Sequence, residues 1–234
     1  MFNPLNVWKG YRKINMDKIV RLWLRYYPVF LEGLFGTLWM SAVTVFFGTI
    51  LGMLIALVHM SKSKIGRTIT DIYIEIIRGT PVLVQLYFFW LGLPKIMPFE
   101  LSDRMCILVA MIVNASAYIS EIIRSGIQAV DKGQWEAGRS VGLSEYHLMV
   151  KVILPQAVKN ILPALCNEFI STIKGTSLAS VFFVGELTTS YKTVQSTTYL
   201  GLQSLIIVAI IYLILNYTLS KLLKVLERRL MVSD

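Results

Sequence analysis

Charged side chains are scarce in this sequence. They make up 16% of its 234 residues, whereas 55% are hydrophobic and the mean hydropathy is +0.62. Soluble domains carry about 25% charged residues, so this composition indicates that lipid surrounds most of the chain. One helical crossing takes roughly 20 apolar residues. The length therefore allows about five crossings and leaves no room for a separate soluble domain.

Cysteine and histidine are also rare. Cys106 and Cys166 lie far apart in apolar surroundings, so they give neither a disulfide framework nor a metal signature. The only histidines are His59 and His147, which excludes a histidine-rich metal centre. No Gly-x-x-x-x-Gly-Lys-Ser/Thr phosphate loop occurs, so the chain itself is not expected to hydrolyse ATP. We expect no metal and no cofactor. The N-terminus also lacks the cleavage pattern of a signal peptide.

The charge that is present is mostly basic, with a net value of +9. Basic loops on the cytoplasmic side of a membrane protein explain it better than nucleic-acid binding, which we do not expect. Residues 1–27 interleave Arg and Lys with Trp and Tyr, a pattern typical of a helix lying in the headgroup layer. Residues 28–230 then form one membrane domain, and residues 231–234 a short tail.

Long apolar runs predict an all-α, polytopic membrane protein. The fourth run is the weakest, because Pro155 and Pro163 interrupt it. The predicted spans are residues 34–58, 69–93, 103–125, 152–184 and 198–220. Five spans place the basic N-terminal segment outside, against the positive-inside tendency. No uncharged run of spanning length precedes Leu34, so five remains the prediction.

The tetrapeptide Glu-Ile-Ile-Arg occurs twice, at residues 75–78 and 121–124. It opens the second predicted span and closes the third, so adjacent antiparallel helices would bring both copies to one face of the membrane. Acid and base stand three residues apart, so each copy can pair internally on a helix. The basic residues nearby, together with the basic C-terminus, assign this face to the cytoplasm.

A polar segment between the third and fourth spans is the strongest candidate for function. Residues 134–147 predict one short helix rich in small side chains. Gly138 and Gly142 would each weaken a solitary helix by about 1 kcal/mol relative to Ala. Docking against a partner explains such a segment better than independent stability.

The same segment resembles the EAA loop of ABC importer permeases. The match consists of Glu136-Ala137-Gly138, then Gly142, then Leu154-Pro155. It departs from the family pattern at Gly138, where a second Ala is usual, and at Val152, where Ile is usual. The resemblance implies a coupling helix, about residues 134–147, that sits in a groove of a cytoplasmic ATPase subunit. Its coupling residues would be Glu136, Ala137, Gly138, Gly142 and Leu143.

Further matches are to the polar amino acid uptake subgroup. They lie at residues 77–85, at 114–118 with Glu121, at 167–170 and at 227–229, and the resemblance covers about residues 28–230. It implies a type I ABC importer permease, similar in fold to the methionine importer, in the bacterial cytoplasmic membrane. The implied partners are an ATPase dimer, a second permease subunit, identical or different, and a solute-binding protein that delivers an amino acid.

Polar groups at mid-depth in a membrane are costly, so they mark candidate substrate contacts. The candidates are Thr80, Gln85, Asn114, Ser116, Gly175, Thr176 and Ser177. In similar permeases the position of Gly175 often holds an acid that receives a cationic group. Glycine there predicts a neutral or less cationic substrate, such as cystine or glutamine.

Simpler interpretations stay open at several of these positions. The only role of the segment that ends at Pro81 could be to kink a helix. Asn114 and Ser116 could serve only to join helices by hydrogen bonds. An ion-coupled secondary carrier would use Glu168, the only acid well inside a predicted span, unless Lys159 or Lys174 pairs with it. A membrane enzyme is a further alternative, but no histidine–carboxylate cluster or nucleophile–base pair supports it.

Overall fold

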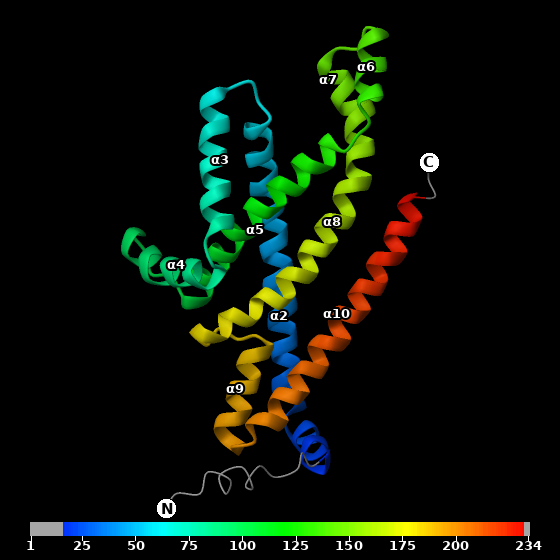
Figure 1. Cartoon of the computed structure of the whole chain (residues 1–234). Helices are drawn as coiled ribbons and strands as arrows, with labels where there is room; N and C mark the ends of the chain where they lie inside the picture. Colours follow the sequence, from blue (N-terminus) through cyan, green and yellow to red (C-terminus); the bar gives the residue numbers. More distant parts are fainter. Residues whose placement is uncertain (1–15, 232–234) are drawn as a thin grey trace, which may run out of the picture.

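The computed structural model describes residues 16–231, and this part of the chain contains helices and no strands. Figure 1 shows the long helices side by side, with α6 and α7 at one end and α9 at the other. The helices are α2 (Met16–His59), α3 (Lys64–Gly79), α4 (Val82–Ile96), α5 (Asp103–Gln128), α6 (Lys132–Ser140), α7 (Glu145–Leu148), the π-helix η1 (Met149–Ile153), α8 (Leu154–Gly175), the 3-10 helix η2 (Thr176–Phe182), α9 (Leu187–Thr198) and α10 (Gly201–Met231).

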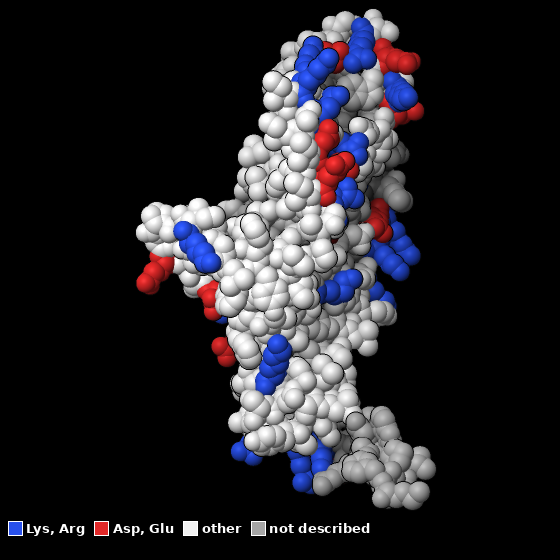
Figure 2. Space-filling model, turned by 60° about the vertical axis from the view of Figure 1, so that its left-hand side comes forward, with Lys and Arg blue, Asp and Glu red and all other residues white. Residues whose placement is uncertain are grey.

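The expectation of an all-α membrane fold with about five crossings is confirmed. Four helical stretches are long and apolar enough to span: Met16–His59, Asp103–Gln128, Glu145–Phe182 and Gly201–Arg229. The pair formed by α3 and α4 brings the number to five if it counts as one crossing. Figure 2 shows a largely uncharged middle, with basic and acidic side chains crowded at the end that carries α6 and α7.

The second predicted span, residues 69–93, is wrong as a single helix. The axes of α3 and α4 meet at 107°, and the break falls at Thr80 and Pro81. Proline disfavours helical backbone in the residue before it, and Thr80 is accordingly extended at φ −112° and ψ 145°. Proline also lacks an N–H group, so the helix cannot continue through it. Pro81 therefore breaks the helix, and the interpretation that this is its only role stays a prediction.

Helix α2 is longer than the first predicted span because residues 16–33 belong to it as well. Ile19 and Leu22 are buried against a cluster that includes Leu187 of α9 and Val208 of α10. The described part of the N-terminal segment therefore packs on the bundle, and residues 1–15 lie outside the described residues. The proposal that residues 1–27 form an interfacial segment remains a prediction.

The packing of α2 on α5 holds the centre of the molecule together. Gly48 and Gly52 allow the two helices to approach closely, because a Cβ atom at Gly52 would lie 2.9 Å from the carbonyl oxygen of Ser116 and 3.1 Å from Ile119. In lipid no hydrophobic effect drives helices together, so van der Waals packing must hold them. Small residues at the crossing permit the close approach that this packing needs. This crossing holds α5, which carries several residues of the candidate site, against α2.

Candidate functional site

The polar segment between α5 and α8 forms two helices, so the prediction of one helix over residues 134–147 is wrong. Helix α6 ends at Ser140 and α7 begins at Glu145. Gly142 lies in the turn between them with φ +77°, a left-handed conformation that glycine adopts without steric cost. The sequence placed Gly142 within a weakened helix, whereas the structure uses it to change chain direction.

Gly138 is buried, but inside this chain. A Cβ atom at Gly138 would lie 2.3 Å from Cδ1 of Leu148, and Leu148 is fully buried in the cluster that α5, α7 and α8 share. The glycine therefore lets α6 pack directly on α7. Close approach to a partner, which the small side chains suggested, is not needed to explain this position.

A solvent-exposed ion pair joins the two short helices. Nε of Arg139 lies 2.8 Å from Oε1 of Glu145, and Nη2 donates to Oε2 at 3.3 Å. The hydrogen bond to Glu145 raises the pKa of the Arg139 guanidinium. Val141 and Tyr146 point outward with exposed fractions of 76% and 72%. Glu136 and Ala137 are also exposed, and Leu143 is half-buried. Because they contain the expected coupling helix, we name α6, α7 and the turn between them the coupling unit.

The coupling unit continues into the membrane through a π-helix. The N–H of Leu154 donates to the carbonyl of Met149, five residues back, just before Pro155. In a regular helix the ring of Pro155 would clash with the carbonyl four residues earlier. The wider π turn relieves that clash, and such turns are frequent at functional sites. The helical backbone therefore runs without a break from α7 through η1 into α8.

A cavity of about 230 Å³, here named the central cavity, lies between α2, α4, α5, α8 and η2. It is lined by Thr44, Val82, Met111, Asn114, Ala115, Tyr118, Glu168, Ser171, Thr172, Gly175 and Leu178. Of the predicted substrate contacts, Asn114 and Gly175 belong to this lining. Thr44, another lining residue, is buried, and its hydroxyl has no hydrogen-bond partner among the described residues.

Glu168 is the only charged residue in that lining. It is half-buried, and within residues 16–231 the structure records no ion pair for it. Pairing with Lys174, which the sequence left open, is therefore not seen. An unpaired acid inside a membrane helix is costly and marks a candidate site.

The remaining predicted contacts are satisfied within the chain. Nε2 of Gln85 donates to Oγ1 of Thr80 at 2.8 Å and to the carbonyl of Ile77 at 2.7 Å, which caps the broken end of α3. Its Oε1 accepts from Asn114 at 2.9 Å. Ser116 is fully buried and bonds Tyr73 of α3 at 2.7 Å, as the interhelical interpretation predicted.

Thr176 and Ser177 lie just after α8. The hydroxyl of Thr176, which is buried, donates to the carbonyl of Ile173 at 2.7 Å. The hydroxyl of Ser177 donates to the carbonyl of Lys174 at the same distance. Both hydroxyls therefore return to the backbone of α8, and neither residue belongs to the lining of the central cavity.

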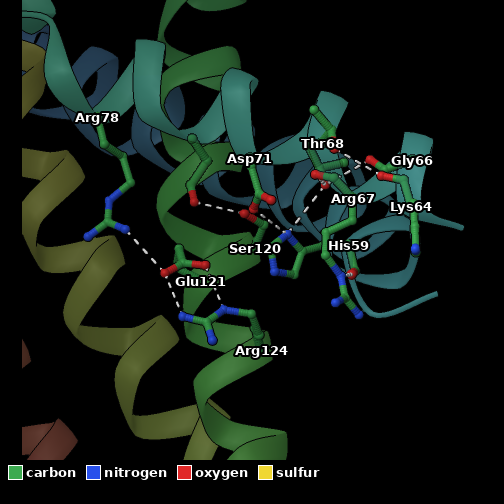
Figure 3. Close-up of polar contacts among 12 residues, drawn as sticks. His59, Lys64, Gly66, Arg67, Thr68, Asp71, Arg78, Ser120, Glu121 and Arg124 are labelled. Atoms are coloured by element: carbon green, nitrogen blue, oxygen red, sulfur yellow. Dashed lines mark hydrogen bonds and ion pairs between the residues drawn. The ribbon is translucent and has the colours of Figure 1, made fainter. Parts of the chain in front are cut away.

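A second pocket, of about 550 Å³, adjoins the central cavity. It is lined by Arg78, Tyr118, Glu121, Ile122, Ser125, Ala164, Asn167, Glu168 and Ser171. Glu121 joins two arginines there: Arg124 lies on its own helix, at 2.8 Å, and Arg78 reaches it from α3, at 3.2 Å (Figure 3). Internal pairing of the repeated tetrapeptide is thus confirmed for residues 121–124 but not for 75–78, where Arg78 pairs with Glu121 instead.

A family model for the inner membrane components of binding-protein-dependent transport systems matches residues 48–232. The chain belongs to this family. It is a permease subunit of an ABC importer, and such subunits work with ATPase and binding-protein partners.

Curated relatives cover almost the whole permease. It is 37% identical over 202 residues to a putative glutamine transport system permease protein of Rickettsia bellii, covering 86% of this chain and 93% of that one. Identity is 38% to the arginine transport system permease protein of Bacillus subtilis, with 88% and 94% covered. It is also 38% to the L-cystine transport system permease protein of the same organism, with 88% of each chain covered.

Solved structures share the permease fold. The crystal structure of an amino acid ABC transporter with histidines superposes with a TM-score of 0.87 at 42% identity, covering 93% of this chain and 99% of that one. An inward-facing methionine ABC transporter superposes with a TM-score of 0.73 at 20% identity, covering 86% and 96%. The expected likeness to the methionine importer fold is thereby confirmed.

Three residues around the central cavity escaped the sequence-based selection. Thr44 was hidden in an uncharged run, where a lone threonine usually bonds to its own helix. Tyr118 was noted only as part of a matching motif. Glu168 was weighed for an ion-coupled carrier and left out of the substrate set. The position of Glu168 inside a predicted span was the signal that could have added it to the predicted substrate contacts.

Proposed function

We propose that the permease imports amino acids and binds them in the central cavity through Glu168. The observation that carries this proposal is that Glu168, for which the structure records no ion pair within residues 16–231, lines the central cavity. Every α-amino acid carries an ammonium group, and a carboxylate in a site of low dielectric binds it strongly. The glutamine, arginine and cystine permeases among the relatives support the same substrate class.

The single acid also supports a neutral substrate. Glu168 can serve the α-ammonium group, and within the described part of the chain no second acid lines the central cavity for a cationic side chain. Gly175 leaves open space, because a Cβ atom there would meet nothing within 4 Å. A neutral or less cationic amino acid of the glutamine or cystine type fits this lining best.

Energy for import would come from partner subunits. The exposed face of the coupling unit, which includes Glu136, Val141 and Tyr146, is the proposed contact with a dimer of cytoplasmic ATPase subunits. In this arrangement the coupling unit and the C-terminus lie in the cytoplasm, and the chain itself hydrolyses no ATP. A second permease, identical or paralogous, completes the membrane domain, and a solute-binding protein delivers substrate from outside.

Reconstitution tests the proposal. The permease is placed in proteoliposomes with its ATPase, and its binding protein is added outside with radiolabelled glutamine or cystine. We expect uptake that needs ATP inside and that survives collapse of the proton and sodium gradients. Uptake that persists without ATP and stops when the gradients collapse would instead support an ion-coupled carrier, with Glu168 as the coupling residue.

Introducing an acid at Gly175 is expected to change selectivity. Gly175→Asp places a second carboxylate in the open space of the central cavity. Binding of arginine to the purified complex should tighten about tenfold relative to glutamine, because a charged hydrogen bond contributes about 1.5 kcal/mol. Equilibrium binding of both radiolabelled amino acids measures the ratio. Gly175→Asn is the uncharged control, and an unchanged ratio in Gly175→Asp would remove Gly175 from the site.

A further inference from the structure

The second pocket continues the path from the central cavity toward the coupling unit. The two cavities share Tyr118, Glu168 and Ser171. Along α5 the lining advances from Met111 to Ser125, which is toward the start of α6. Along α8 the lining runs back from Gly175 to Ala164, which is toward α7. A substrate that leaves Glu168 for the coupling end must therefore pass the second pocket.

Arg78 enters this pocket from the last turn of α3. Its guanidinium lies over the ring of Tyr118, 5.4 Å from the ring centroid, and so is held beside a residue that lines both cavities. The side chain is 43% exposed and makes one contact with Glu121, from Nη1 to Oε2 at 3.2 Å. Figure 3 shows the guanidinium reaching toward Glu121 from the side opposite Arg124.

The two ion pairs of Glu121 are unequal. Arg124 donates twice, from Nε to Oε1 at 2.8 Å and from Nη2 to Oε2 at 2.9 Å. Such a bidentate pair is the stronger form of arginine–carboxylate contact. Glu121 would therefore stay paired if Arg78 left it, whereas Arg78 would become free to bind another anion. Arg78 is the partner that can be exchanged at low cost.

We propose that Arg78 binds the α-carboxylate of the substrate on its way out, in exchange for Glu121. This inference rests on the proposed function, because it assigns the second charged group of the same amino acid. The ammonium group is held at Glu168, which borders both cavities. Transfer of the carboxylate to Arg78 draws the substrate into the second pocket, and return of Glu121 to Arg78 releases it. No bond is made or broken beyond these ion pairs.

The competing interpretation is that the Arg78–Glu121 pair only ties α3 to α5. Two neutral variants separate these roles. Arg78→Gln removes one ion pair of Glu121 and the proposed carboxylate site. Glu121→Gln weakens both ion pairs but leaves the Arg78 cation available to substrate. A purely structural pair predicts that Glu121→Gln is the more harmful change in every measurement, because it affects two contacts.

The test measures stability and transport in the same variants. Each full complex is reconstituted with saturating binding protein, and initial ATP-driven uptake of radiolabelled glutamine or cystine is measured. We expect the melting temperature to fall more in Glu121→Gln and the maximal uptake rate to fall more in Arg78→Gln, there by about tenfold. The half-saturating substrate concentration should not change, since the binding protein sets it.

The outcomes are distinct. Uptake that falls equally in the two variants, or further in Glu121→Gln, overturns the role of Arg78 while leaving amino acid import intact. A wild-type complex that imports no amino acid refutes the proposed function itself. Where Arg78→Gln does not assemble, Arg78→Lys replaces it, because lysine keeps the charge but loses the planar fork that matches a carboxylate. A wild-type rate in Arg78→Lys would equally overturn the proposal.

Discussion

Glu168→Gln is expected to lower ATP-driven amino acid uptake about 100-fold. The change keeps the size of the side chain and removes the charge that faces the ammonium group in the central cavity. Loss of one partner from a desolvated charge pair costs about 3 kcal/mol, and this energy corresponds to roughly 100-fold in binding. Substrate binding to the purified complex and uptake in proteoliposomes should fall together.

Two controls make that result specific. Glu100→Gln removes an acid from the exposed segment before α5 and should leave uptake unchanged. Basal ATP hydrolysis by the Glu168→Gln complex should persist, because α6 and α7 keep their packing and their ion pair. Normal uptake by Glu168→Gln would contradict the proposed site directly, whatever substrate is used.

The membrane fold was predictable because apolar length carries most of the information. Uncharged runs located the crossings, since lipid requires about 20 apolar residues in each, but α2 and α10 extend well beyond their predicted spans. Hydropathy could not show the turn of 107° at Thr80 and Pro81, because α3 and α4 taken together are apolar enough to count as one crossing. What makes the break tolerable is Gln85, whose side chain bonds the carbonyls that α3 leaves open. That contact depends on the folded geometry.

The repeated tetrapeptide illustrates a partly successful deduction. Its two copies predicted that adjacent antiparallel spans would bring these residues to one face of the membrane, and in the structure Arg78 of α3 does contact Glu121 of α5. The expected pairing of Glu75 with Arg78 does not occur, and in the described part of the chain no ion pair is recorded for Glu75. A pattern of i and i+3 charges shows which pairs are permitted, but neighbouring helices decide which pairs form.

Polarity at mid-depth selected residues in and around the central cavity, but it could not show which of their polar groups are satisfied within the chain. Ser116 and Gln85 are polar residues whose side chains form hydrogen bonds within the bundle. For Thr44 and Glu168, which line the central cavity, the structure records no side-chain hydrogen bond or ion pair within residues 16–231. All four residues are polar and lie in apolar surroundings, so residue type alone does not distinguish them. Only the three-dimensional inventory of donors and acceptors separates a structural polar group from one available to substrate.

The coupling unit offers the second large effect. Gly138→Leu is expected to weaken association of the ATPase about 30-fold, because a side chain at 138 collides with Leu148 and forces α6 away from α7. Overpacking of this kind costs about 2 kcal/mol, which is the energy equivalent of that loss. Co-purification of the ATPase with the permease and a binding titration measure the change.

A compensating substitution decides whether the glycine serves this chain or its partner. Leu148→Ala removes the side chain that Gly138→Leu would strike, so the double variant restores the volume between α6 and α7. Association of the ATPase should recover to within about threefold of the wild type, although Leu148→Ala alone leaves a cavity and is itself harmful. If the double variant binds no better than Gly138→Leu, position 138 touches the ATPase directly. Packing against Leu148 would then not be the reason that position 138 requires glycine.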